Sequence, residues 1–390
     1  MRETAWPLTC ARVLHDHSHA PVCTHALVRG CAAAWQVISR LLKANASVRT
    51  TFDQSKVAPL IQLLNAGSPA GQQQAACALA EVALVPANRK AIEDAQGIEA
   101  LVGLLSSSVV GTSETAARVL GNLGGADNQA EGGGDPASAE RRQHILRAGG
   151  IKQLAGMLSA VSLGSAVIAR KMWELIAKVI GANPNEEKGG QQAEAQLLGV
   201  QEVAACAIAD LTKSDAPMQR AIIDEGCLPM MLTLMKSGSQ VAQEHAARAI
   251  LHLCDLPENQ AMVIEGGAIA ELVLLSRQGS AAAQAMAAAI ISTLAKDADD
   301  ERRSGIVAAG GLPPLIGLVS TGNPMAKAQA ASALWHLSVD QENRDAITKA
   351  GGIPTLAQLL DDGTAASHEI AIATLKRWAP RTARRGLCTV

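Results

Sequence analysis

The N-terminal residues that could do chemistry are a run of histidines and cysteines. Such side chains bind zinc or copper when three or four of them converge at suitable spacings. The spacing here matches no standard structural zinc site, and the segment has the composition of an unstructured leader. We therefore favour a disordered leader over a metal site. The cluster comprises Cys10, His15, His17, His19, Cys23 and His25.

A second candidate is the glycine-rich stretch at residues 124–140, which reads GGADNQAEGGGDPASAE. A phosphate-binding loop joins a strand to a helix and carries Lys followed by Ser or Thr after its glycines. Neither feature is present, so this stretch is predicted to be an exposed loop that binds no nucleotide. The chain also lacks G-x-S-x-G and H-E-x-x-H motifs. We expect no enzyme activity, no catalytic residue, no cofactor, no bound metal and no small-molecule substrate.

The rest of the sequence shows a repeated pattern of predicted helices, and these helices must position any functional side chains. The clearest unit is residues 343–378, which begins NRDAITKAGGIPTLAQLL and ends in an apolar helix at Trp378. It reads as a short helix, a Gly-Gly turn, a second helix and a third helix with paired small residues. Similar units begin at Asn88, Asn259 and Arg302. Internal repetition predicts a repeat protein, in which each unit buries its apolar stripe against its neighbours.

The repeat length can be counted on the third helix, where the second of two small residues marks each unit. The interval lies in the low forties, except for a long step to Ala169 and a short step from it to Ala205. Repeats of this length with two or three helices form the armadillo and HEAT class. The marks are Ala34, Ala76, Ala117, Ala169, Ala205, Ala247, Ala288, Ala331 and Ile372.

At these residues the chain resembles the armadillo family of β-catenin and importin-α. Repeats of that family run N-x-x-x-I, then G-[GA]-[IL]-P-x-L-x-x-L-L, then A-A-x-A-L-x-x-L, and the resemblance extends over about residues 26–378. It implies an all-α superhelix, or solenoid, of about eight to nine three-helix repeats with a partial first repeat. It also implies a non-enzymatic scaffold that binds a peptide or helix of a partner protein in a concave groove lined by the third helices.

The resemblance assigns two positions of each third helix, four residues apart, to this groove, where importin-α carries Trp and Asn. Only Trp35 and Asn122 keep those types, in different repeats, so the asparagine ladder that would hold a peptide main chain is missing. The predicted groove mixes both charges, which suits a partner of mixed charge. Alternatively, these side chains pair with each other and stay solvated. The candidates are Trp35, Glu81, Arg118, Asn122, Arg170, Glu174, Asp210, Arg248, His252 and His336.

The predicted domain map has three parts. Residues 1–25 form a poorly ordered leader, residues 26–378 the solenoid and residues 379–390 a basic tail. Besides the loop at 124–140, a loop is expected at 181–196, because ANPNEEKGGQQAEAQ separates a third helix at 165–180 from the next one. The tail is either solvated or a nuclear address.

Composition limits the partners and the compartment. A net charge of −2 and an aromatic content of 2% do not favour nucleic acid as a partner. The sequence contains no run of 18 apolar residues, so it predicts no membrane span. The eight cysteines form no C-x-x-C pair, which predicts buried thiols in a reducing compartment, cytoplasmic and/or nuclear. A second functional hypothesis is an adaptor in ubiquitin ligation or nuclear transport.

Overall fold

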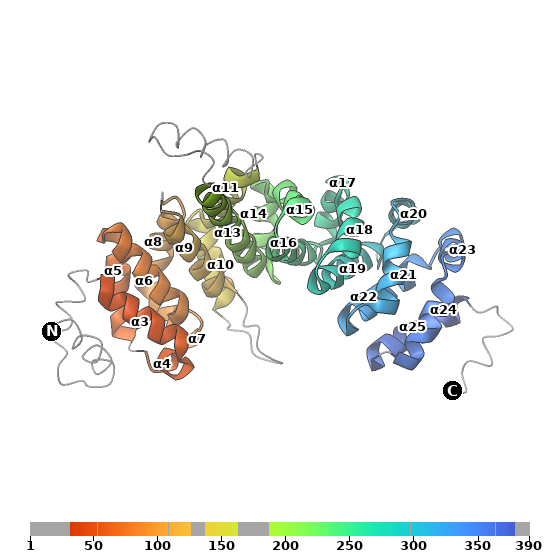
Figure 1. Cartoon of the computed structure of the whole chain (residues 1–390), viewed down its shortest axis with the longest axis horizontal. Helices are drawn as coiled ribbons and strands as arrows, with labels where there is room; N and C mark the ends of the chain where they lie inside the picture. Colours follow the sequence, from red (N-terminus) through yellow and green to blue (C-terminus); the bar gives the residue numbers. More distant parts are fainter. Residues whose placement is uncertain are drawn as a thin grey trace. The chain divides into compact units, whose positions relative to one another are not determined.

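The computed structural model describes residues 32–52, 54–107, 109–125, 137–162, 187–296, 298–362 and 364–378. Every regular element in these ranges is helical, and the helices follow one another three to a repeat (Figure 1). The predicted all-α repeat architecture is confirmed. The predicted leader (1–25), the tail (379–390) and the third helix expected at 165–180 lie outside the described residues. The chain divides into two compact units, Met1–Glu225 (unit 1) and Gly226–Val390 (unit 2).

The described residues of unit 1 run from a third helix, α3, to the first helix of a later repeat, α14. Its third helices α3, α6, α9 and α13 pack in a row, each against the next. Its elements are α3 (Ala32–Ala44), α4 (Ala46–Thr50), η2 (Gln54–Lys56), α5 (Val57–Ala66), α6 (Pro69–Val82), α7 (Pro86–Asp94), α8 (Gly97–Leu104), α9 (Val110–Gly124), α10 (Ser138–Arg147), α11 (Gly150–Ser162), α13 (Glu187–Thr212) and α14 (Ala216–Asp224).

The described part of unit 2 contains four further third helices, α16, α19, α22 and α25, which again pack in a row. The contact between α19 and α22 is the most extensive between any two helices in the described part of the chain. Its elements are α15 (Cys227–Ser237), α16 (Gln240–Leu253), α17 (Pro257–Glu265), α18 (Ala268–Gln278), α19 (Ala281–Lys296), α20 (Asp300–Ala308), α21 (Leu312–Thr321), α22 (Pro324–Leu337), α23 (Gln341–Lys349), α24 (Gly352–Asp362) and α25 (Ala365–Trp378).

The order of third helices in unit 1 differs from the prediction at one place. Helix α13 packs directly on α9, and the Cα of Ala207 lies 3.2 Å from where a Cβ on Gly121 would be. Ala205 therefore follows Ala117 in the stack, and counting Ala169 as a separate repeat between them was wrong. Helices α10, α11 and α13 form one repeat, with residues 163–186 inserted between its second and third helices.

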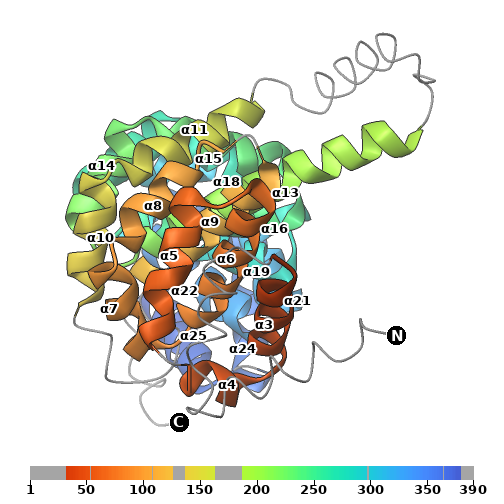
Figure 2. The ribbon, with the colours of Figure 1, turned by 90° about the vertical axis from the view of Figure 1, so that its left-hand side faces the viewer.

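The two predicted loops have different outcomes. Helix α13 begins at Glu187, so the loop predicted at 181–196 is wrong from that residue onward. Its Gln, Glu and Ala residues are good helix formers that outweigh the cost of two glycines. Figure 2 shows these first turns of α13 extending away from the other helices of unit 1. The loop predicted at 124–140 falls between α9 and α10, and residues 126–136 lie outside the described part.

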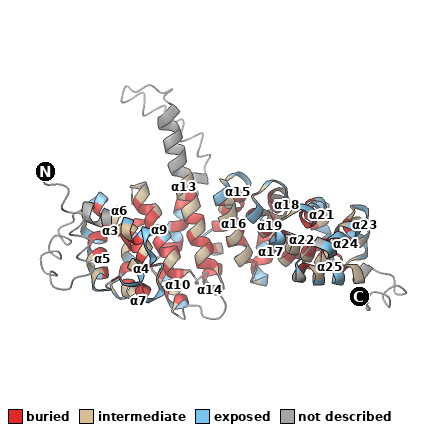
Figure 3. Cartoon of the chain, turned by 60° about the horizontal axis from the view of Figure 1, so that its bottom comes forward, coloured by how far each residue is buried: buried red, intermediate tan, exposed pale blue. Residues whose placement is uncertain are grey.

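Pairs of alanines hold the third helices close together. Because an alanine side chain is a single methyl group, two helices can approach closely where alanines meet. Figure 3 shows the buried residues in red on the sides of helices that face their neighbours. The fully buried alanine pairs are Ala75–Ala76, Ala116–Ala117, Ala204–Ala205, Ala246–Ala247, Ala287–Ala288 and Ala330–Ala331, all at 0% exposure.

The turn between the first and second helix of a repeat uses a left-handed residue. Such a residue ends a helix by satisfying its last carbonyl groups, and glycine adopts it without steric cost. Gln96 takes this conformation between α7 and α8, with φ 58°, where the five later repeats have glycine. The glycines are Gly149, Gly226, Gly267, Gly310 and Gly351, with φ between 72° and 85°.

From α7 onward, one side chain of each first helix ties it to the end of the preceding third helix. This seam residue is Arg or Gln, three positions before a buried Ile or Val. It donates a hydrogen bond to a carbonyl that has no partner within its own helix. The bonds run from Arg89 Nε to Ala83 O (2.9 Å), Arg142 Nη1 to Gly124 O (2.9 Å), Gln219 Nε2 to Thr212 O (3.0 Å), Gln260 Nε2 to Cys254 O (2.9 Å), Arg303 Nη1 to Ala298 O, and Arg344 Nη1 to Ser338 O (2.9 Å).

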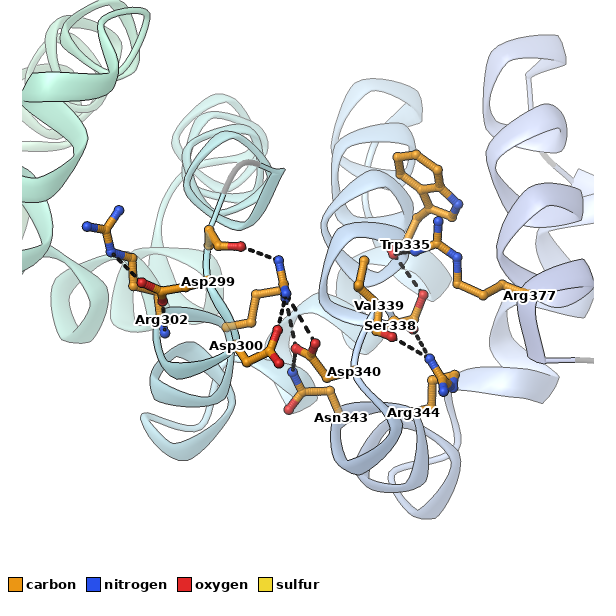
Figure 4. Close-up of polar contacts among 12 residues, drawn as sticks. Asp299, Asp300, Arg302, Trp335, Ser338, Val339, Asp340, Asn343, Arg344 and Arg377 are labelled. Carbon is orange, nitrogen blue, oxygen red and sulfur yellow. Dashed lines mark hydrogen bonds and ion pairs between the residues drawn. The ribbon is translucent and has the colours of Figure 1, made fainter.

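Two of these arginines also reach the first helix of the following repeat. Arg142 Nε lies 2.8 Å from Asp215 Oδ2, and Arg303 Nε lies 2.8 Å from Asp340 Oδ2. Each aspartate is the N-cap residue of the helix that follows it. The hydrogen bond from Arg303 lowers the pKa of Asp340, although partial burial opposes this shift. Asp300 and Asp340 both approach this guanidinium (Figure 4).

Candidate functional site

The predicted groove residues occupy two positions on each third helix, one and five residues after its second small residue. Residues four apart lie on one side of a helix. We call the surface formed by these positions the third-helix face. Every described side chain on it except Ala289 is half-buried or exposed, next to fully buried alanines. The first and second positions are Trp35 and Ser39, Cys77 and Glu81, Arg118 and Asn122, and Cys206 and Asp210 in unit 1, and Arg248 and His252, Ala289 and Thr293, Ser332 and His336, and Ala373 and Arg377 in unit 2.

Two candidates in unit 1 make contacts within the chain. Glu81 forms an ion pair with Arg49 of α4, at 3.1 Å between Oε2 and Nη1. Asn122 donates from Nδ2 to the carbonyl oxygen of Ala80 on α6, at 3.1 Å. Asn122 therefore ties α9 to α6, and Glu81 is partly neutralised. Neither contact is with another groove candidate, since Arg49 lies outside the candidate set and Ala80 contributes only its main-chain oxygen.

Carboxylates gather where α9 meets α13. Arg118 is exposed on α9, and Asp210 on α13 accepts a hydrogen bond from Cys206 Sγ at 3.6 Å. Burial raises the pKa of Glu114, the charge of Arg118 opposes this shift, and the nearby Glu202 adds to it. The surface here is therefore more acidic than the two predicted positions alone indicated.

Glu114 and Glu202 were missed by the sequence reasoning. Each lies four residues before the first position of its helix, which places it one turn further along the same side. That spacing was visible in the sequence, so extending the pattern by one turn finds both residues.

The side chains of three predicted candidates lie outside the part of the chain that the structure describes. Arg170 and Glu174 lie outside the described residues, as does the side chain of Trp35, whose backbone belongs to α3.

In unit 2, Arg248 and His252 lie half-buried on α16, and His336 lies half-buried on α22. The imidazole ring of His336 approaches the ring of Trp335 edge-on, with 4.6 Å between centroids. Burial raises the pKa of Asp255, and the charge of His252 opposes this shift. The candidates of unit 2 are therefore one arginine and two histidines, and all three are half-buried.

Arg377 on α25 is a further face residue that the candidate set left out. Its Cζ lies 4.7 Å from the ring centroid of Trp335, and its Nη1 donates to the Trp335 carbonyl oxygen at 3.2 Å. Arg344 donates to the carbonyl oxygens of Ser338 and Val339 beside this pair (Figure 4). Burial and the charge of Arg344 lower the pKa of Arg377. Two cations thus lie at the C-terminal end of α22, where the helix dipole favours positive charge.

The described residues offer little for covalent or metal chemistry. Burial raises the pKa of the Cys254 thiol to about 12, so this cysteine stays protonated and is a poor nucleophile near neutral pH. Across the described ranges, no group of three or more His, Cys, Asp and Glu side chains could hold a metal ion. The leader cluster of histidines and cysteines lies outside these ranges.

Membrane-spanning length is likewise not reached by any single helix that the structure describes. Helices α20 and α21 together meet the length and composition of a span, with a bend of 75° between them.

Three stretches of the chain match the family model described as Armadillo/beta-catenin-like repeat. They are residues 86–124, 215–255 and 299–339. These stretches are armadillo repeats. They coincide with the helix triplets α7 to α9, α14 to α16 and α20 to α22, so the first, second and third helices assigned from the structure are the three helices of the armadillo unit.

Known proteins with similar sequence or fold agree with this assignment. Armadillo repeat-containing protein 3 of Homo sapiens is 38% identical over 92 residues, which are 23% of this chain and 10% of that protein. The match therefore spans about a tenth of the length of that curated relative.

Solved structures resemble the chain over longer ranges. An engineered protein superposes with a TM-score of 0.60 at 25% identity, covering 98% of this chain and 91% of its own. A designed armadillo repeat protein in complex with the peptide (KR)4 gives a TM-score of 0.55 at 21% identity, covering 72% of this chain and 99% of its own. Computationally designed armadillo repeat proteins for modular peptide recognition give the same values. These structures share the armadillo fold, and the predicted resemblance is confirmed.

Proposed function

We propose that the chain is a non-enzymatic scaffold that binds a peptide or helix of a partner protein along its third-helix face. One observation carries the proposal: chemically varied polar side chains reach the surface at the same two positions of successive third helices, beside alanines that are fully buried. A surface built in this way varies its side chains without disturbing the packing below. Variation of that kind suits recognition of another chain.

The repeat spacing supports an extended partner. Neighbouring packed helices lie roughly 10 Å apart, and an extended chain advances about 3.3 Å per residue. Every third residue of an extended peptide therefore meets a new third helix. A designed armadillo repeat protein of similar fold has been solved with the peptide (KR)4. Asn122, however, already bonds Ala80, so recognition in this chain rests on charged side chains more than on an asparagine ladder.

Selection of peptides from a random library against the full chain tests this proposal. Selected peptides should lose affinity when face charges are reversed in Arg248→Glu or Asp210→Lys. The matched control is Arg277→Glu, which makes the same change of charge at an exposed position on the second helix α18. Peptides whose binding responds to the control variant and not to the face variants would show that the third-helix face is not the binding surface.

A carrier for basic signal peptides, as in nuclear transport, is the second candidate. The carboxylates of Glu114, Glu202 and Asp210 favour it, because together they outnumber the guanidinium of Arg118 on the same surface. Titration with a basic import peptide tests it: sub-micromolar binding that is lost in the Glu81→Ala, Asp210→Ala double variant supports transport. We place either role in the cytosol and/or nucleus, since Cys77 and Cys254 are free thiols.

A further inference from the structure

Helix α25 has one side that no other described helix covers. The helix packs against α22 and α24 (Figure 1), and Ala371 on the packed side is fully buried. On the adjoining side Ile372 is 39% exposed, although its equivalent on α22, Ala331, is at 0% exposure. Leu375 is half-buried, whereas its equivalent Leu334 is fully buried. Apolar positions that α22 buries are therefore open to solvent on α25.

The corresponding side of α22 faces the following repeat, because Arg377 of α25 lies over the ring of Trp335, at 4.7 Å from Cζ to the centroid. On α25 the equivalent of Trp335 is Lys376. The second helix of the same repeat is exposed in the same way: Ile353 on α24 is 36% exposed, where α21 has Leu312 at 5%. The open surface therefore extends over both helices, and we call it the end face. It comprises Ile353, Glu369, Ile372, Leu375 and Lys376.

The isoleucine at position 372 suits a different neighbour from another closely packed repeat. Alanines let successive third helices approach closely, and the three further carbons of isoleucine hold a packed helix farther away. Apolar side chains gathered on an exposed surface mark an interaction site. Residues 379–390 offer little to cover this one, because they contain three arginines and their only large aliphatic residues are Leu387 and Val390.

The two charged residues of the end face have opposite signs and lie on either side of Ile372. Glu369 is three residues before it and Lys376 four residues after it, so all three share one side of α25. Within the described residues neither charged side chain forms an ion pair. A second copy, related by a two-fold axis at Ile372 with its α25 antiparallel, brings its Lys376 opposite Glu369. Their heights along the helix differ by one residue, roughly 1.5 Å.

We propose that the end face joins two copies of this chain through an antiparallel pair of α25 helices. The two isoleucines meet at the axis, and the symmetry forms the pair of Glu369 with Lys376 twice, once on each side of them. Leu375 adds apolar contact beside the isoleucines. A helix of 14 residues is only about 21 Å long, so the contact is small and the dimer is a weak one.

Sedimentation velocity of the full chain at increasing concentration tests the inference. We expect monomer to give way to dimer between about 1 and 100 µM. Ile372→Asp should weaken the dimer at least about tenfold, because two carboxylates would meet at the axis. Glu369→Lys and Lys376→Glu should each weaken it about tenfold, because each places like charges opposite one another. The matched control is Lys296→Glu, the same change at an exposed position of α19, which should leave the dimer unchanged.

A mixture of the two charge variants tests the antiparallel arrangement itself. A chain with Glu369→Lys carries two positive charges on the end face, and a chain with Lys376→Glu carries two negative ones. Each variant repels its own copies, but the mixed dimer contains both ion pairs and should form as readily as the unsubstituted one. If the mixture associates no better than either variant alone, the pairing of Glu369 with Lys376 is wrong and the inference fails.

Hydrogen exchange locates the contact without any substitution. Amides of α24 and α25 should gain protection as the concentration of the chain rises, while those of α16 should not change. A dimer whose added protection lies outside α24 and α25 would overturn the inference. A chain that stays monomeric at the highest concentration would overturn it too, including the case in which another segment of the same chain covers the end face.

Discussion

The substitution Arg142→Gln tests how the repeats of unit 1 are joined. Gln219 and Gln260 show that glutamine at the seam position keeps the bond to the preceding third helix, at 3.0 and 2.9 Å. Glutamine at 142 should therefore keep its bond to Gly124 and lose only its charge. What is lost is the 2.8 Å ion pair with Asp215, in which both side chains are nearly inaccessible, at 6% and 5% exposure.

The cost follows from leaving one buried charge alone. Asp215 Oδ1 would still accept hydrogen bonds from the Met218 amide at 3.0 Å and from Gln143 at 3.4 Å, but no cation would face Oδ2. Removing one partner of a buried ion pair costs about 3–5 kcal/mol of unfolding free energy. The second substitution Asp215→Asn keeps the N-cap acceptor and removes the stranded charge. The double variant should therefore recover most of the loss.

Urea denaturation of the four proteins, followed by circular dichroism, completes the double-mutant cycle. Because repeat arrays need not unfold in a single step, hydrogen exchange of α10 and α14 should be measured alongside. Their protection should fall in Arg142→Gln and return in the double variant. A loss below about 1 kcal/mol, or no recovery with Asp215→Asn, would refute the view that an uncompensated buried carboxylate sets the cost.

Three further predictions concern single residues. Gln96→Gly should raise the unfolding free energy by about 1 kcal/mol, because glycine adopts φ 58° without strain, and an unchanged or lower melting temperature would contradict this. The pKa of Asp340 is lowered in the folded chain by Arg303, so this pair stabilises above the ordinary carboxyl pKa of about 3.9 and its contribution is lost as pH falls through the lower folded value. Asp340→Asn should therefore unfold more easily at neutral pH and show a shallower further loss in acid, as followed by melting curves from pH 7 to about 2, whereas parallel curves for the two proteins would exclude the linkage. Cys254 is buried and its pKa is raised to about 12, so it should react with iodoacetamide only on unfolding. The half-buried Cys77 should react before Cys254 does. Mass spectrometry of the labelled peptides decides the order.

The sequence was sufficient for most of the repeat pattern, because helix length and turn chemistry are local. From α7 onward a left-handed residue follows each first helix, and paired alanines recur where neighbouring third helices meet, so the spacing of those residues follows from the fold. The order of the third helices near Ala169 could not be predicted from this spacing. Residues 165–180 and α13 both carry the pattern of a third helix, and tertiary packing on α9 distinguishes them.

On the third-helix face, too, positions along one helix could be predicted from the sequence, whereas contacts between residues far apart in the sequence could not. The positions of Arg248 and His252 on one side of α16 follow from a spacing of four residues. The ion pair of Glu81 cannot be predicted from such spacing, because its partner Arg49 lies 32 residues earlier, on a short helix that no repeat pattern marks. Likewise, the stacking of Arg377 on Trp335 joins two repeats 42 residues apart, and only the packed structure brings them together.

In unit 2 the seam residue changes from glutamine at Gln260 to arginine at Arg303 and Arg344, so the joints between its repeats differ in strength. Between α20 and α23, Arg303 bridges to Asp340, whereas Gln260, at the same place in α17, has no charge to offer Asp299 at the start of α20. A force applied to the C-terminal end should therefore not detach repeats one at a time. The last two repeats of the described chain should separate together, and the joint that gives way first should be the one that glutamine holds.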